Sequence, residues 1–313
     1  MRKEAKVAKQ AADVAHIAGY YEAGGHHGST YQYQGFKVNK YFTSDRFEKL
    51  TADFKRPNGQ PMQGFGLEIE TACNSISNDS VLAEVLDKLV FAQFPADLFK
   101  FQHDGSLQGS STVECITQVM TKLFIRNNYK AFKLMYDHYF KNLGIRCNSS
   151  CGMHTNISNA CFGKTQEAQE TAIRKLYYII NRHYSVACNL FNRSTDHTMY
   201  CRQMDYSEAK TMNLHYFQSN HGVCFNLGHV DEGRIELRLV GPQISYGCFR
   251  NTMESVFFLV ERVRSISWAD CDSIEKIFTG CNQYVYDRLK TKCNLSVETL
   301  QAIKATVKHE ELL

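Results

Sequence analysis

Charged side chains alternate with apolar ones in two short segments of this sequence. GRIELR spaces Arg234, Glu236 and Arg238 two residues apart, and GLEIET does the same with Glu68 and Glu70. Successive side chains on a strand point to opposite faces of a sheet. Each segment therefore predicts a strand with one apolar face and one face of acids or arginines.

Two further segments show the same alternation. CGMHTNIS places His154, Asn156 and Ser158 on one face, and STVECIT flanks Glu114 with apolar neighbours. For any one of these segments, an ordinary antiparallel strand with a solvated polar face is the usual explanation. Solvated faces carry mainly Thr, Lys, Ser and Gln, whereas these four carry acids and a histidine. Together they favour a shared functional face.

The chemistry of such a face follows from its charges. If Glu68, Glu70, Glu114 and Glu236 meet on one sheet, each pair about 4 Å apart repels by about 4 kcal/mol at an effective dielectric constant of 20. The cluster then needs cations, or some of the acids stay protonated. Carboxylates with one imidazole and no thiolate suit Mg²⁺ or Mn²⁺, and arginine recognises phosphate in a two-pronged way. Metals, phosphate and arginine together are typical of phosphoryl transfer.

The elements that must position these residues alternate irregularly between extended and helical segments. We predict extended segments at 64–72, 98–107, 111–120, 151–158, 222–229 and 234–240, and helices at 79–92, 122–142, 165–190 and from about 247 to the end. A regular strand–helix–strand alternation is missing, which disfavours a doubly wound parallel sheet and predicts an α+β fold. We expect residues 1–60 to form an N-terminal helical extension (helix over 2–23) and loop, and residues 61–313 to form one catalytic domain.

Five segments, taken in order, resemble the amidoligase family of the glutamine synthetase and glutamate–cysteine ligase superfamily of carboxylate–amine ligases. They are GLEIE, HDGSL with VECIT, CGMHTNIS, NRSTDHTMYC and FNLGHVDEGRIELR, and they span about 65–260. GMHTNIS and RIELR are also similar to segments of glutamine synthetases themselves. The resemblance implies a curved antiparallel sheet, helices on its convex side and a helical C-terminal part.

The resemblance also implies roles for individual residues. It implies metal ligation by Glu68, Glu70, Glu114, His154 and Glu236. It implies catalysis by Arg238, which steadies the transferring phosphoryl group, and Asp104, a ligand or a base toward the amine. It implies nucleotide contacts by Arg234, Asn156 and Ser106, and substrate contacts by Arg193, Tyr200 and His103. The family often has a second histidine where Asn156 stands, and a serine where Asn192 stands.

The implied cofactors are ATP and two or three Mg²⁺ or Mn²⁺ ions. The implied activity is that of a carbon–nitrogen ligase: ATP activates a carboxylate as an acyl phosphate, and an amine displaces the phosphate to form an amide or peptide bond. The substrates would be a carboxylate and an amine on small molecules, peptides or proteins. Two alternatives stay open: a phosphotransferase of the same superfamily acting on a guanidino or amine group, and a non-catalytic binding or structural protein on this fold.

Composition excludes several other classes. The 313 residues are 43% hydrophobic, with 36 basic and 32 acidic side chains and a net charge of +4, which is too weak to indicate nucleic-acid binding. No apolar run approaches the roughly 18 residues of a membrane helix, and the N-terminus lacks the apolar stretch of a secretory signal. The twelve cysteines include no CxxC pair. We therefore expect a cytoplasmic protein with reduced thiols in its core.

Overall fold

The computed structural model describes residues 63–308 apart from 77, 91–93, 95–97, 103–106, 118, 195–200 and 218–221, together with two short strands nearer the N-terminus. These two strands, β1 (Tyr20–Tyr21) and β2 (Gln32–Tyr33), pair antiparallel. The helix expected over 2–23 therefore does not continue through Tyr20–Tyr21. The rest of the expected N-terminal extension and loop lies outside the described residues.

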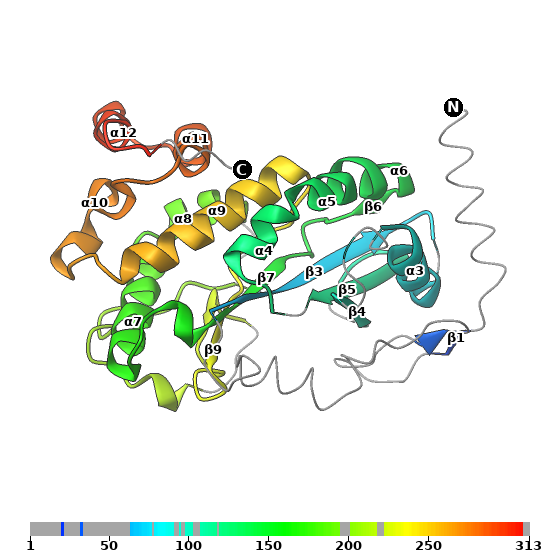
Figure 1. The fold of residues 1–313 in the computed structure, drawn as a ribbon, viewed down its shortest axis with the longest axis horizontal. Coiled ribbons are helices and arrows are strands. Elements are labelled where there is room, and N and C mark those ends of the chain that lie inside the picture. Colours follow the sequence, from blue (N-terminus) through cyan, green and yellow to red (C-terminus); the bar gives the residue numbers. More distant parts are fainter. Residues whose placement is uncertain are drawn as a thin grey trace.

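The fold is α+β and is built on an open antiparallel sheet (Figure 1). Its strands are β3 (Phe65–Cys73), β4 (Phe99–Gln102), β5 (Ser111–Thr117), β6 (Ile145–Arg146), β7 (Met153–Ser158), β8 (Phe225–Asn226) and β9 (Arg234–Leu237). Their order is β4-β5-β3-β7-β9-β8, and β6 pairs with one end of β3. All these pairings are antiparallel, which confirms the predicted class.

Helices pack on the apolar face of this sheet. Leu67 and Ile69 of β3 are fully buried there. The ring of Phe65 meets that of Phe257 on α9 (Tyr246–Val263) with 4.8 Å between centroids. Figure 1 shows α9 running along this side of the sheet together with α4, α5 and α8. Because the helices bury one face, every strand must present its alternate residues on the other face.

The long helices that the sequence predicts are divided into shorter ones in the structure. They are α3 (Asp79–Val85), the π-helix η1 (Leu86–Val90), α4 (Lys122–Asn127), α5 (Tyr129–Leu134), the π-helix η2 (Met135–Phe140), α6 (Lys141–Leu143), the 3₁₀ turn η3 (Asn159–Cys161), α7 (Gln166–Arg182), α8 (Tyr184–Leu190), the 3₁₀ turn η5 (Leu214–Tyr216), the 3₁₀ turn η6 (Ala269–Asp272), α10 (Ile274–Phe278), α11 (Gln283–Lys292) and α12 (Val297–Lys304). The predicted helix 122–142 is interrupted at Asn128, whose side-chain amide donates to the Phe124 carbonyl at 2.8 Å. It ends at Gly144, as predicted, because φ there is +69° and glycine adopts this conformation at little cost.

Two other helix predictions need correction. The helix expected over 165–190 is broken at His183, where φ is −110° and ψ is 41°. The side chain that caps α3 is Asn78, which accepts from the Val81 amide at 3.2 Å, rather than the expected Asp79 or Ser80. Asp79 instead accepts a hydrogen bond from the backbone of Thr112 at 2.7 Å, so it ties α3 to β5.

The twelve cysteines are all free, and eleven of them are buried. Burial raises the pKa of several of these thiols, to about 12 for Cys161, so they stay protonated and unreactive. This agrees with the predicted use of cysteine as a small core residue. In the part of the chain that the structure describes, no helix is both long enough and apolar enough to cross a membrane.

One buried acid links the helices behind the sheet. Glu254 of α9 is fully buried and accepts two hydrogen bonds from Arg126 of α4, at 2.9 and 2.6 Å. It also accepts from the Tyr129 hydroxyl at 2.7 Å and from Asn282, ahead of α11, at 2.9 Å. A buried charge is stable only with such a full set of partners. Glu254 therefore fixes α4, α5 and α11 on α9.

We expect Glu254→Gln to lower the free energy of unfolding by about 3 kcal/mol, because it leaves Arg126 without its buried counter-charge. Glu261→Gln is a matched control: Glu261 lies two turns further along α9 and pairs with Lys122 of α4 at 2.8 Å, but its side chain is 56% exposed. The control should cost less than about 1 kcal/mol. Urea unfolding of the two variants measures the difference, and equal losses would contradict the role given to Glu254.

Candidate metal centre

Strand register brings the predicted acids and the histidine together on the face opposite the helices. Glu68 on β3 lies directly across from His154 on β7, and Asn156 on β7 lies across from Glu236 on β9. On the other side of β3, Glu70 pairs with Glu114 of β5. Residues directly opposite one another share a face. The four neighbouring strands β5, β3, β7 and β9 therefore carry one continuous polar row.

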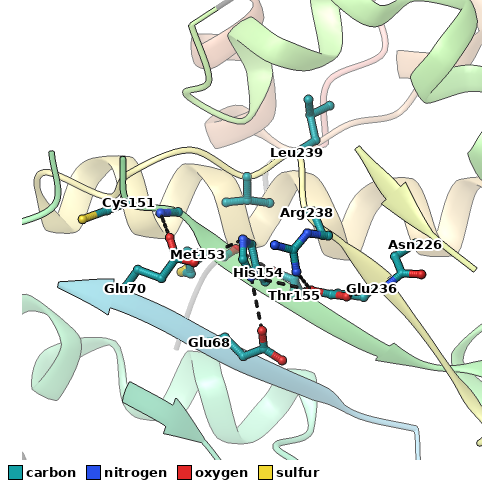
Figure 2. Close-up of polar contacts among 12 residues, drawn as sticks. Glu68, Glu70, Cys151, Met153, His154, Thr155, Asn226, Glu236, Arg238 and Leu239 are labelled. Carbon is teal, nitrogen blue, oxygen red and sulfur yellow. Dashed lines mark hydrogen bonds and ion pairs between the residues drawn. The ribbon is translucent and has the colours of Figure 1, made fainter. Parts of the chain in front are cut away.

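His154 lies at the middle of this row (Figure 2). Its Nδ1 is 3.2 Å from Glu68 Oε2 and 3.5 Å from Glu236 Oε1, and its Nε2 is 3.5 Å from Glu70 Oε1. Glu70, His154 and Glu236 are 5%, 6% and 3% exposed, while the Glu68 side chain is 23% exposed. One imidazole therefore touches three carboxylates, of which Glu68 is the most accessible.

Glu68 and Glu236 also accept hydrogen bonds from side-chain amides and an arginine. Arg238 Nη1 donates to Glu236 Oε1 at 2.6 Å, and Asn226 Nδ2 donates to Glu236 Oε2 at 2.8 Å. Asn156 Nδ2 donates to Glu68 Oε1 at 2.7 Å, and Asn156 accepts from Arg234 Nη1. The two arginines thus belong to the same network as the acids, in addition to any role toward phosphate.

Opposite charges in this network stabilise one another's ionised forms. Burial alone would raise the pKa of Glu68, but the hydrogen bond and charge of His154, together with Asn156 and Arg238, lower it to about 2. Burial alone would lower the pKa of His154, yet Glu70, Glu68 and Glu236 raise it overall. Burial likewise opposes the charge of Arg238, and Glu236 and Glu68 raise its pKa. The side chains of His154 and Arg238 thus supply part of the positive charge that we expected this cluster to need.

The donor atoms also fit a divalent cation. Two groups have ligand atoms that all lie within 4.8 Å of one another: Glu68, His154 and Glu236, and Glu70, Glu114 and His154. Octahedral Mg²⁺ binds oxygen at about 2.1 Å, so neighbouring ligands sit about 3 Å apart. The 3.2 and 3.5 Å separations around His154 Nδ1 are close to that spacing. An imidazole that keeps one proton offers one lone pair, so His154 can serve only one of the two groups at a time.

A backbone amide anchors the third carboxylate. Glu70 Oε2 accepts a hydrogen bond from the amide of Gly152, and the Glu70 amide donates to the Gly152 carbonyl at 3.1 Å. A Cβ at position 152 would lie 2.7 Å from Arg193 Nη2 and 3.3 Å from Glu70 Oε2. Glycine is therefore the residue that lets the loop before β7 approach Glu70 so closely.

Arg193 holds this loop against the segment that follows β9. Its side chain donates to the carbonyl oxygens of Cys151, Leu239 and Val240 at 3.3, 3.4 and 2.8 Å. Arg193 is 7% exposed. Its expected role on the substrate side stays a prediction, and the geometry shows that it clamps the backbone on both sides of the site.

Four other predicted site residues lie outside the described residues: His103, Asp104, Ser106 and Tyr200. The structure brings together the five predicted metal ligands with Asn156, Arg234 and Arg238. Sequence reasoning missed Asn226 and Gly152. Asn226 had a usable signal, since it is a single polar residue between Phe225 and Leu227 in a predicted strand. Gly152 had none, because its role comes from a neighbour 82 positions away.

Comparison with known proteins does not assign the chain to a family. No family model matches it, and a search of curated proteins finds no match either. The geometry of the site is therefore what bears on the function.

We expect Arg193→Lys to destabilise the fold by about 2 kcal/mol, because lysine cannot reach several carbonyl groups with a planar set of donors. Arg202→Lys is the control, since Arg202 also donates to a carbonyl, that of Gly222 at 3.4 Å, but is exposed. Thermal or urea unfolding of both variants checks this. An unchanged stability for Arg193→Lys would favour the substrate contact over the clamp.

We expect Mn²⁺ to bind this face, with an affinity at least about ten-fold weaker in Glu236→Gln because one anionic ligand becomes neutral. Glu232→Gln is the control: this acid precedes the same strand and pairs with Arg234 at 3.3 Å, but its side chain is 50% exposed. Calorimetric titration or the spin resonance signal of free Mn²⁺ gives both constants. Equal affinities in wild type and Glu236→Gln would remove Glu236 from the site.

Proposed function

We propose that this protein is an ATP-dependent amidoligase whose catalytic domain has the glutamine-synthetase-like curved sheet. One observation carries the proposal: Glu68, His154 and Glu236, from β3, β7 and β9, have their ligand atoms within 4.8 Å of one another. The same face carries Arg234 and Arg238. This combination of acids, imidazole and arginine is the one that divalent metals and nucleotide phosphates require.

The proposed cofactors are ATP with Mg²⁺ or Mn²⁺. Glu68, His154 and Glu236 would hold one ion, and Glu70 with Glu114 would hold a second through carboxylate oxygens. When bound, the ions neutralise charge on the phosphates and polarise the phosphoryl group that is transferred. Within the chain, Asn156 orients both Glu68 and Arg234, because its amide hydrogen-bonds to the first and its carbonyl to the second.

Arg238 connects the metal and phosphate sites. It donates to Glu236 Oε1, the same oxygen that lies 3.5 Å from His154 Nδ1. If that oxygen binds a divalent cation, Arg238 loses part of its attraction to Glu236 and can turn its guanidinium to an anion. Metal and nucleotide should therefore bind with positive coupling, because each favours the same position of Arg238.

The proposed reaction has two steps. A substrate carboxylate oxygen attacks the γ-phosphorus of ATP, the bond to ADP breaks, and an acyl phosphate forms. An amine then attacks the acyl carbon, phosphate leaves, and the amine proton passes to a base, for which Asp104 is the predicted residue. Arg238 would steady charge on the phosphoryl group. The burial of Glu70 and Glu236 limits water near the acyl phosphate.

Two other functions, a phosphotransferase and a non-catalytic protein, can be distinguished from an amidoligase by ADP release. A phosphotransferase would use the same face but would release ADP with an amine or guanidino substrate alone. A non-catalytic protein is favoured by one observation, namely that Arg238 and His154 already compensate the acids without any metal. ADP release therefore has to be measured across a matrix of carboxylates and amines.

We expect ADP release only when a divalent metal, a carboxylate and an amine are present together, and we expect EDTA to abolish it. Glu236→Gln should reduce the rate at least about a hundred-fold while the circular dichroism spectrum stays unchanged. Glu232→Gln is the matched acid control. Turnover at the wild-type rate in Glu236→Gln, or with metal removed, would refute the proposed site.

We expect Arg238→Lys to lose most activity, because lysine offers a point charge where the guanidinium offers two parallel donors. It should also weaken the coupling between Mn²⁺ and ATP in binding titrations, which a merely structural arginine would leave unchanged. Arg264→Lys, at an exposed residue after α9, is the control. Wild-type coupling in Arg238→Lys would show that Arg238 does not contact phosphate.

A further inference from the structure

A cavity lies apart from the sheet face that carries Glu68, Glu70, Glu114 and Glu236, which we call the carboxylate face. It has a volume of about 800 Å³, is open to solvent on one side, and is lined by η2, α6, β6 and the turn that leads into α9. None of the predicted metal ligands lines it. Small-molecule sites in proteins usually measure about 300–1,000 Å³, so this cavity is large enough for an organic ligand.

The lining combines an apolar floor with a basic rim. Phe140, Ile145 and Cys147 are buried and line the floor, and Ile244 at the rim is 69% exposed. Apolar side chains in a cavity can hold the body of a ligand that water solvates poorly.

Two exposed cations of the lining have no acidic partner among the residues that the structure describes. Lys141 and Arg146 line the cavity, are exposed, and form no ion pair with any described carboxylate. The one acid in the lining, Asp137, already accepts the Tyr246 amide at the start of α9 at 3.0 Å. The start of an 18-residue helix adds partial positive charge. The rim therefore favours an anionic group.

One polar group in the lining lacks a hydrogen bond. Tyr136 is 3% exposed, and its hydroxyl has no partner among the described residues. Buried hydroxyl groups are nearly always hydrogen-bonded, and leaving one unpaired costs free energy. A ligand whose polar group reached this hydroxyl would supply the partner that it lacks.

The cavity wall is continuous with the loop that anchors Glu70. Arg146 of β6 pairs with Ala72 of β3, two residues beyond Glu70. After Cys147, the Asn148 carboxamide accepts from the Ser150 amide at 2.9 Å and donates to the Gln108 carbonyl at 2.6 Å. The same loop then reaches Gly152, which hydrogen-bonds to Glu70. A ligand against this wall therefore contacts the segment that positions a proposed metal ligand.

We propose that this cavity is a second ligand site, which binds an amphipathic organic anion with an apolar body and a carboxylate, sulfonate or phosphate group. The anionic group pairs with Lys141 and Arg146, and the body packs on Phe140, Ile145 and Ile244. We further infer that occupancy stabilises the 145–152 segment and so tightens metal binding at Glu70, a step that rests on the proposed function.

The probe for the binding step is 1-anilinonaphthalene-8-sulfonate, whose fluorescence rises in apolar surroundings. We expect the double variant Lys141→Gln/Arg146→Gln to weaken its affinity roughly five-fold, since two exposed ion pairs are lost. Lys130→Gln/Lys133→Gln is the control, because it removes the same charge from exposed residues of α5 that do not line the cavity. Equal affinities in the two double variants would overturn the site.

A second pair of variants tests the apolar body. Ile244→Ser should weaken probe binding, whereas Val297→Ser should not, although Val297 is equally exposed at 64%. Arg238→Gln should leave the affinity unchanged, and a loss there would place the probe on the carboxylate face and overturn the assignment. These measurements need no catalytic activity, so failure of the proposed function would not affect them.

The coupling is tested by titrating Mn²⁺ with and without probe, at a probe concentration equal to its wild-type dissociation constant. We expect the Mn²⁺ dissociation constant to fall in wild type and to fall by clearly less in Lys141→Gln/Arg146→Gln, whose cavity is mostly empty at this probe concentration. A constant value in wild type would overturn the coupling and leave the cavity as an independent site. Absence of Mn²⁺ binding in wild type would refute the metal centre and the coupling with it, without changing the result for the probe.

Discussion

The burial of several carboxylates on one face of a sheet is the constraint on which this structure depends. Glu70, Glu114 and Glu236 are each less than one-tenth exposed, and Glu68 lies beside them. Ionised acids in such a place are stable only if cations and donors surround them. His154 meets this demand at the centre by touching three of them, and Arg238 meets it at one side. The same arrangement makes the face suitable for a divalent cation.

The apolar side of the sheet maintains this arrangement. Strand alternation puts the neighbours of each acid on the other face, and most of these neighbours, such as Leu67, Ile69, Ile235 and Leu237, are apolar and buried. A slip of one residue between β3 and β7 would turn Glu68 toward the helices and Leu67 toward the polar face. Such a slip would bury uncompensated charge. The packing behind the sheet, including the Glu254 cluster, therefore stabilises the register that assembles the site.

The loop before β7 connects the cavity with the residues of the candidate metal centre. Gly152 hydrogen-bonds to Glu70, and Arg193 ties the neighbouring Cys151 to the backbone after β9, where Arg238 lies. The beginning of the same segment lines the cavity with the basic rim. The positions of Glu70 and Arg238 are thus set in part by backbone contacts of this loop. This connectivity is the physical basis for treating the cavity and the carboxylate face as related sites.

The sequence by itself determined which residues share a face and where many elements lie. The alternation around Glu68, His154 and Glu236 is local, so it predicted strands and an α+β fold, and Gly144 correctly marked the end of a helix. Other features depended on residues distant in the chain. The contact of Glu68 with His154, the hydrogen bond of Gly152 with Glu70, the clamp by Arg193 and the contact of Asn226 with Glu236 arise from pairing between segments. Only the tertiary structure decided them, because strand register is fixed by hydrogen bonds between segments, which no local period encodes.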